Sequence, residues 1–159
     1  MITSGPVIHI VPNAWIRIQD STRDDVETGG VLLGWRVDGD VFVTQMIEVP
    51  DGNARRTSYT RRQRIAQKML EEVLEDLPEN TVTGYVGEWH VHPAPAGPSS
   101  VDEREIQRLS EKTLTPLGLV VCARDSLDGH WTPHGLIGLN GRVINSEVRV
   151  EEVIANDET

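Results

Sequence analysis

Two histidines separated by one residue mark the part of the chain whose residue types could do chemistry. They lie in the stretch GEWHVHPAPAGPSSVDE, residues 87–103. Residues two apart on a strand point to the same face, so Glu88, His90 and His92 are expected to project together. A short, proline-rich loop then leads to Asp102 in the first turn of a helix. Two imidazole nitrogens, a carboxylate oxygen and a water would complete a tetrahedral zinc site with an open position, which is the catalytic arrangement.

Each part of this pattern also has an ordinary structural explanation. A His-x-His pair on a strand is more often a surface or core pair than a pair of metal ligands. A serine followed three residues later by an acid forms a capping box, which fits both Ser99 with Asp102 and Ser100 with Glu103. It is the combination of a strand end, a stiff loop and an acid at a helix N-terminus that favours a metal site.

Strands and helices that alternate along the chain must position these residues. Strands are expected at 7–11, 27–37, 40–49, 81–92, 117–123, 130–139 and 142–152, and helices at 12–25, 60–77 and 99–112. The pairs Asp38-Gly39 and Asn140-Gly141 are typical of hairpin turns. Elements interleaved in this way within one small domain predict a mixed α/β fold, a three-layer α-β-α sandwich around a central mixed sheet.

Length and composition limit the function classes. The chain has 159 residues, of which 38% are hydrophobic, so it is long enough to bury a sizeable core. Its formal net charge of −10 argues against nucleic acid or an anionic membrane as the main partner. The single cysteine, Cys122, lies in an apolar run and is expected to be an inert core thiol. With no signal-like start and no apolar stretch long enough for a membrane span, a cytoplasmic location is expected.

Two separated motifs carry a resemblance to a known family. The stretch HVHPAPAGPSSVD resembles the JAMM motif of the JAB/MPN metalloproteases, in which His-x-His-Pro is followed by a loop and Ser-x-x-Asp. ETGGVLLG is similar to the family's upstream glutamate, here Glu27, at the start of a strand. The similarity runs from about residue 7 to 124. It implies one JAB/MPN domain over 1–154, with a frayed tail at 155–159, and a cytidine-deaminase-like arrangement of a central mixed sheet with about three helices.

The resemblance also implies roles for particular side chains. His90, His92 and Asp102 would bind one zinc ion per chain. Glu27 would act as the general base that takes a proton from the attacking water and returns it to the leaving amine. Ser99 would help to hold the oxyanion that forms at the scissile carbonyl.

This chain departs from the family pattern in two places. The loop before the serine is one residue shorter than usual, so a shifted register would use Ser100 and Glu103. The sequence SSVD in register favours Ser99 and Asp102. The second departure is Glu88, where many relatives have an apolar aromatic residue. It is a rival base or a partner that fixes a histidine tautomer, and a solvated carboxylate at a strand end explains it equally well.

By resemblance, the expected function is that of a zinc-dependent isopeptidase or peptidase. It would hydrolyse the bond after the C-terminal tail of a ubiquitin-like (β-grasp) modifier, with the tail held near Glu27 and the loop 93–98. The chain resembles the short prokaryotic, deubiquitinase-like branch, which is associated with ubiquitin-like conjugation, sulfur-carrier and antiviral operons. The alternatives are a non-catalytic MPN scaffold or binding module, a relative associated with DNA repair, and a hydrolase that acts on a sulfur-carrier protein tail.

Other residues with suggestive chemistry have simpler explanations. His9, His130 and His134 lie outside the motif and are expected to be hydrogen-bonded or surface histidines. Gly29 and Gly30 do not form a phosphate loop, because no Gly-Lys-Ser/Thr ending follows them. Because they lack side chains, Gly29 and Gly30 are expected to let a neighbouring backbone segment come close beside the metal.

Overall fold

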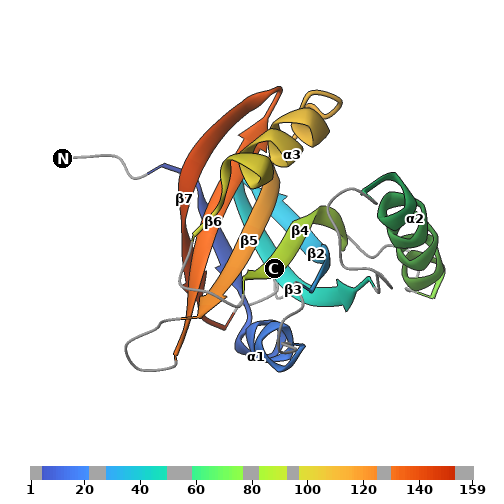
Figure 1. Cartoon of the computed structure of the whole chain (residues 1–159), viewed down its shortest axis with the longest axis horizontal. Coiled ribbons are helices and arrows are strands. Elements are labelled where there is room, and N and C mark those ends of the chain that lie inside the picture. Colours follow the sequence, from blue (N-terminus) through green and yellow to red (C-terminus); the bar gives the residue numbers. More distant parts are fainter. Residues whose placement is uncertain are drawn as a thin grey trace, which may run out of the picture.

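A computed structural model describes residues 5–21, 28–49, 59–76, 83–92, 97–124 and 130–152, with side chains in the helix that begins at Tyr59 described from Gln67 onward. Within these ranges the strands are β1 (Val7–Ile10), β2 (Gly29–Val37), β3 (Asp40–Glu48), β4 (Gly84–His92), β5 (Leu117–Arg124), β6 (Trp131–Leu139) and β7 (Arg142–Val150). The helices are α1 (Pro12–Asp20), α2 (Tyr59–Glu75) and α3 (Ser100–Ser110) (Figure 1). None of these helices is long and apolar enough to cross a membrane.

The seven strands form one closed sheet in the order β1-β3-β2-β4-β5-β6-β7. Strand β1 closes it, because it pairs in parallel with β3 on one side and with β7 on the other. The predicted three-layer α-β-α sandwich is therefore wrong, since a closed sheet has no pair of open faces to be covered by two helix layers. The pairing is mixed, as expected, with β4 and β5 parallel and the β2–β3 and β6–β7 neighbours antiparallel.

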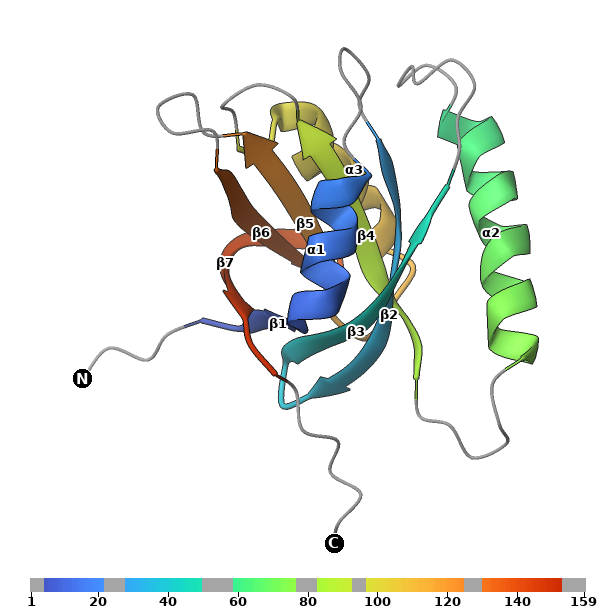
Figure 2. The ribbon, with the colours of Figure 1, turned by 90° about the horizontal axis from the view of Figure 1, so that it is seen from below.

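Buried hydrophobic side chains form one cluster inside the closed sheet and a second cluster on its outer face. Helix α1 lies across one end of the closed sheet (Figure 2), and its Ala14, Trp15 and Ile18 pack with the inward-facing side chains of the strands. Helix α3 covers the outside of β5 and β6 (Figure 1), and its Ile106 packs in a second cluster with Leu119. Both faces of β5 are thus buried, so its sequence reads as a continuous apolar run.

Strand β4 carries the sequence motif, and an irregularity at Gly87 sets the direction of its side chains. The β2–β4 register shifts between Leu32 and Leu33, opposite this glycine. As a result Tyr85 and Glu88 share the α3 side of the sheet although they are three residues apart, and the Tyr85 hydroxyl donates to the Glu88 carboxylate at 3.2 Å. A Cβ at residue 87 would stand 1.9 Å from the carbonyl oxygen of Gly118 on β5, so only glycine fits.

The two predicted hairpin turns are confirmed. Asp38 and Gly39 have φ of 52° and 90°, and Asn140 and Gly141 have φ of 51° and 82°. Positive φ at both central residues is the geometry of a type I′ turn, which matches the right-handed twist of the flanking strands. These turns join β2 to β3 and β6 to β7.

Candidate metal centre

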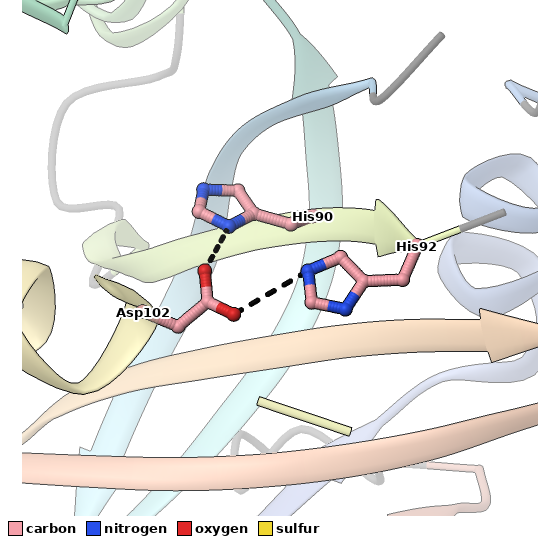
Figure 3. Close-up of side chains that lie close together, drawn as sticks. All are labelled: His90, His92 and Asp102. Carbon is pink, nitrogen blue, oxygen red and sulfur yellow. Dashed lines mark hydrogen bonds and ion pairs between the residues drawn. The ribbon is translucent and has the colours of Figure 1, made fainter. Parts of the chain in front are cut away.

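Strand β4 and helix α3 bring His90, His92 and Asp102 together, as Figure 3 shows. Both histidines project from the end of β4 toward the helix, while Trp89 and Val91, which alternate with them, are fully buried in the interior cluster. His90 and His92 are 8% and 6% exposed, and Asp102 is 0% exposed. A carboxylate and two imidazoles that are this deeply buried must satisfy one another or a bound cation.

The distances among these donor atoms fit a tetrahedral ion. His90 Nδ1 lies 3.0 Å from Asp102 Oδ1, and His92 Nε2 lies 3.3 Å from Asp102 Oδ2. One donor atom from each of the three residues lies within 4.8 Å of the others. Donors about 2.0–2.1 Å from a tetrahedral zinc ion are roughly 3.3 Å apart, so small side-chain movements would bring them to ligand positions. The donor set therefore suits a metal ion.

Ser99 fixes the acid of this group. It is the N-cap of α3, and it forms a capping box in which its Oγ accepts from the Asp102 N–H at 3.2 Å. In return, Asp102 Oδ2 accepts from the Ser99 N–H at 2.8 Å and from its hydroxyl at 3.0 Å. The sequence suggested either a capping box or a metal ligand at Asp102. The structure supports both interpretations for the same residue, because the acid of the capping box is also the acid that faces the imidazoles. Glu103, the acid of the shifted register, is exposed.

The surroundings of Asp102 keep it ionised. Burial on its own raises the pKa of this carboxyl group, but the nearby His90 and His92 rings and a hydrogen bond from the Ser99 N–H outweigh burial and hold its pKa far below the usual range. Metal ligands must be deprotonated to bind. Asp102 is therefore in the form that a cation needs across the whole neutral range.

Glu88 lies on the same face as the histidines, and α3 adds Glu105, an acid that the sequence reasoning missed. Donor atoms of Glu88, His90 and Glu105 also lie within 4.8 Å of one another. Glu105 is one helical turn beyond Asp102, and its Oε2 lies 3.8 Å from His90 Nε2. The i, i+3 spacing from Asp102 was the available signal, since residues so spaced share a helix face.

The predicted base, Glu27, lies outside the described residues, but its neighbours in the chain are placed. The carbonyl oxygen of Thr28 accepts from the Val91 N–H at 2.9 Å. Gly29 pairs with His90 in the β2–β4 register, and a Cβ on Gly29 would stand 3.0 Å from the His90 ring. The chain that follows residue 27 therefore runs directly beside the strand that carries the imidazoles, and the expectation of close backbone approach at Gly29 is confirmed.

The three other histidines are not part of either donor group. The His9 ring lies between the carboxylates of Asp40 and Glu151. His130 is exposed. His134 is closer to the site than expected. Val121 on β5 pairs with His90 on one side and with His134 on the other, and the His134 ring lies beside Gly97.

The fold and the site define a class of protein: a closed mixed sheet with two imidazoles on its outer face and one carboxylate on the helix that covers it, arranged so that they could hold a metal ion. The family model for prokaryotic homologues of the JAB domain matches residues 15–133. The chain belongs to this family, and the resemblance drawn from the two motifs is confirmed.

A solved structure has the same overall fold. The solution structure of protein DSY2949 from Desulfitobacterium hafniense, a structural genomics target, superposes with a TM-score of 0.63. The match covers 96% of this chain and 99% of that one at 16% sequence identity, which shows a shared fold and no more. A search of the curated proteins finds no match.

Proposed function

We propose that this protein is a zinc-dependent isopeptidase or peptidase that hydrolyses the bond after the C-terminal tail of a ubiquitin-like modifier. The observation that carries the proposal is the buried group of His90, His92 and Asp102, which the end of β4 and the first turn of α3 bring together in a member of the JAB family. When bound there, zinc would supply a Lewis acid for the scissile carbonyl and would lower the pKa of water.

The residues around the group would divide the remaining work. His90, His92 and Asp102 would hold the ion, and the capping box from Ser99 would keep the Asp102 carboxylate in place. Glu27 would take a proton from the attacking water and pass it to the leaving amine. Its place in the chain supports this role, because Thr28 is hydrogen-bonded to Val91, between the two imidazoles.

Ser99 would stabilise the developing oxyanion with its hydroxyl proton. The Ser99 oxygen is anchored by the Asp102 N–H, so the O–H can rotate away from the Asp102 carboxylate without moving the side chain. A single donor of this kind typically contributes about 10²–10³-fold to kcat.

Metal content is the first test. Purified wild-type protein should contain about one zinc ion per chain by elemental analysis, and His92→Ala should contain little. Zinc-loaded wild type should then cleave a ubiquitin-like protein whose C-terminal glycine is joined to the ε-amine of a fluorescent lysine peptide. If wild type bound no zinc even after zinc was added, the protein would be a binding module built on the protease fold. If zinc bound but only a linear sulfur-carrier precursor was cut, the substrate assignment would change.

A further inference from the structure

We infer that Glu105 is the positioning residue that orients His90 toward the metal, and the inference rests on the proposed metal site. The two nitrogens of the His90 ring face different acids. Nδ1 lies 3.0 Å from Asp102 Oδ1, while Nε2 lies 3.8 Å from Glu105 Oε2. One ring thus stands between the acid proposed as a ligand and a second acid on the same helix.

One oxygen of the Glu105 carboxylate lacks a hydrogen-bond donor among the described residues. Its side chain is only 12% exposed, and among the described residues Oε2 is a buried atom without a hydrogen bond. A separation of 3.8 Å from His90 Nε2 is too long for a hydrogen bond. Leaving a buried carboxylate oxygen unsatisfied is costly, so this position needs a donor in the working state of the protein.

Metal binding would provide that donor through the chemistry of imidazole. A neutral imidazole carries one proton, so ligation through Nδ1 leaves the proton on Nε2. In His90 that N–H would point to Glu105, and a shift of about 1 Å would make a normal hydrogen bond. Histidine ligands commonly donate their second ring N–H to a carboxylate, which fixes the tautomer and makes the ligating nitrogen more basic.

Helix α3 supports both acids on one rigid element. Asp102 and Glu105 are three residues apart, so they project from the same face of the helix. The capping box at Ser99 fixes the first turn. Glu88 is the competing carboxylate in this donor group, but the Tyr85 hydroxyl already donates to its Oε2 at 3.2 Å. The geometry therefore favours Glu105 over Glu88 as the partner of His90.

Zinc affinity, measured by competition with a chromophoric chelator, tests the assignment without any substrate. Glu105→Ala should weaken zinc binding by about 10–100-fold, which is the usual effect of losing such a partner. Glu105→Gln keeps an acceptor oxygen and should recover most of the affinity. Glu103→Ala is the matched control, because Glu103 is exposed on the same turn. Long-range ¹H–¹⁵N spectra of the zinc-loaded protein should place the His90 proton on Nε2.

Several results would overturn the inference. Zinc affinity of Glu105→Ala within about twofold of wild type would do so, as would a loss seen in Glu88→Ala instead. A lower melting temperature of metal-free Glu105→Gln would indicate a structural role. Two zinc ions in wild type and one in Glu105→Ala would make Glu105 a ligand of a second ion. A wild type that binds no zinc would overturn the proposed function itself, whereas a zinc-binding wild type with an indifferent Glu105 overturns only this inference.

Discussion

Ser99 has two proposed functions, and one substitution tests both of them. Its oxygen caps α3 by accepting from the Asp102 N–H, and its hydroxyl proton is the proposed donor to the oxyanion. The sequence predicted both the cap and its acid, because Ser-x-x-Asp is a local pattern that depends on residues three apart. It did not predict the role of Glu105, since that depends on which face of α3 meets β4.

Replacing Ser99 by alanine should reduce both activity and stability. We expect kcat to fall by about 10²-fold from loss of the donor, and the free energy of unfolding to fall by about 1 kcal/mol from loss of the cap. Steady-state hydrolysis and urea unfolding measure the two effects. Ser99→Thr should restore most of both, and Ser100→Ala, at an exposed position, should change neither. An impaired Ser100→Ala beside a normal Ser99→Ala would support the shifted register.

Glu27 and Glu88 are the two candidates for the general base, and alanine variants distinguish them. Glu27→Ala should retain about one zinc ion per chain and lose nearly all turnover, because the base does not ligate the metal in the proposed mechanism. Glu88→Ala should remain active, since its carboxylate is engaged by the Tyr85 hydroxyl. Zinc content and hydrolysis are measured on the same preparations. An active Glu27→Ala with an inactive Glu88→Ala would reverse the assignment.

Within strand β4, the irregularity at Gly87 determines which side chains face α3. Strict alternation over 81–92 would put Tyr85 on the face of Trp89, whereas the structure puts Tyr85 on the face of His90. The sequence predicted the common face of Glu88, His90 and His92 because no shift interrupts those residues. The shift itself depends on contact with Gly118 on β5, which no local pattern shows.

Gly87→Ala should therefore destabilise the protein strongly. The new Cβ would stand 1.9 Å from the Gly118 carbonyl oxygen, so β4 and β5 would have to separate. We expect a loss of about 3 kcal/mol in the free energy of unfolding, at the upper end for overpacking, and weaker zinc binding because the β4 ligands move. Urea denaturation and chelator competition measure both. Gly84→Ala, on the same strand with nothing within 4 Å of the new Cβ, is the control and should change little. Equal stability of the two variants would show that β4 adapts freely.

The order of strands and helices in the whole chain was predictable from the sequence, but the closure of the sheet was not. The same series of strands and helices fits an open sandwich or a closed sheet, and the two differ only in whether the last strand reaches the first. Strand β1 makes the closure, because it pairs with β3 on one side and with β7 on the other. Pairing between segments at opposite ends of the chain is a property of tertiary packing.

One side chain on β1 strengthens this closure. His9 Nε2 lies 2.9 Å from Asp40 at the start of β3, and its Nδ1 lies 2.6 Å from Glu151 just after β7. Its ring also stacks on Phe42 with centroids 4.3 Å apart. Through these contacts His9 connects the three strands at the point where the sheet closes. The Asp40 carboxylate further accepts from the Val7 N–H at 3.0 Å.

Asp40 should make the closed sheet sensitive to acid. Partial burial raises the pKa of its carboxyl group, but hydrogen bonds from His9 and from the Val7 N–H outweigh burial and leave that pKa below its usual value. Because the pKa is lower in the folded state, the charged form stabilises the fold above the unfolded-state pKa of about 3.9, and this contribution is lost as the pH falls through the folded pKa. Asp40→Asn should therefore melt at a lower temperature than wild type at pH 7, with the gap narrowing below about pH 4.

Thermal melts from pH 7 to pH 3 measure this narrowing. Asp38→Asn is the matched control, since it makes the same change at an exposed position of the same hairpin and should follow the wild-type curve throughout. A gap between wild type and Asp40→Asn that stayed constant down to pH 3 would show that the charge on Asp40 does not stabilise the closure. In that case the packing of His9 on Phe42 and the pairing of β1 with β3 and β7 would hold the sheet closed by themselves.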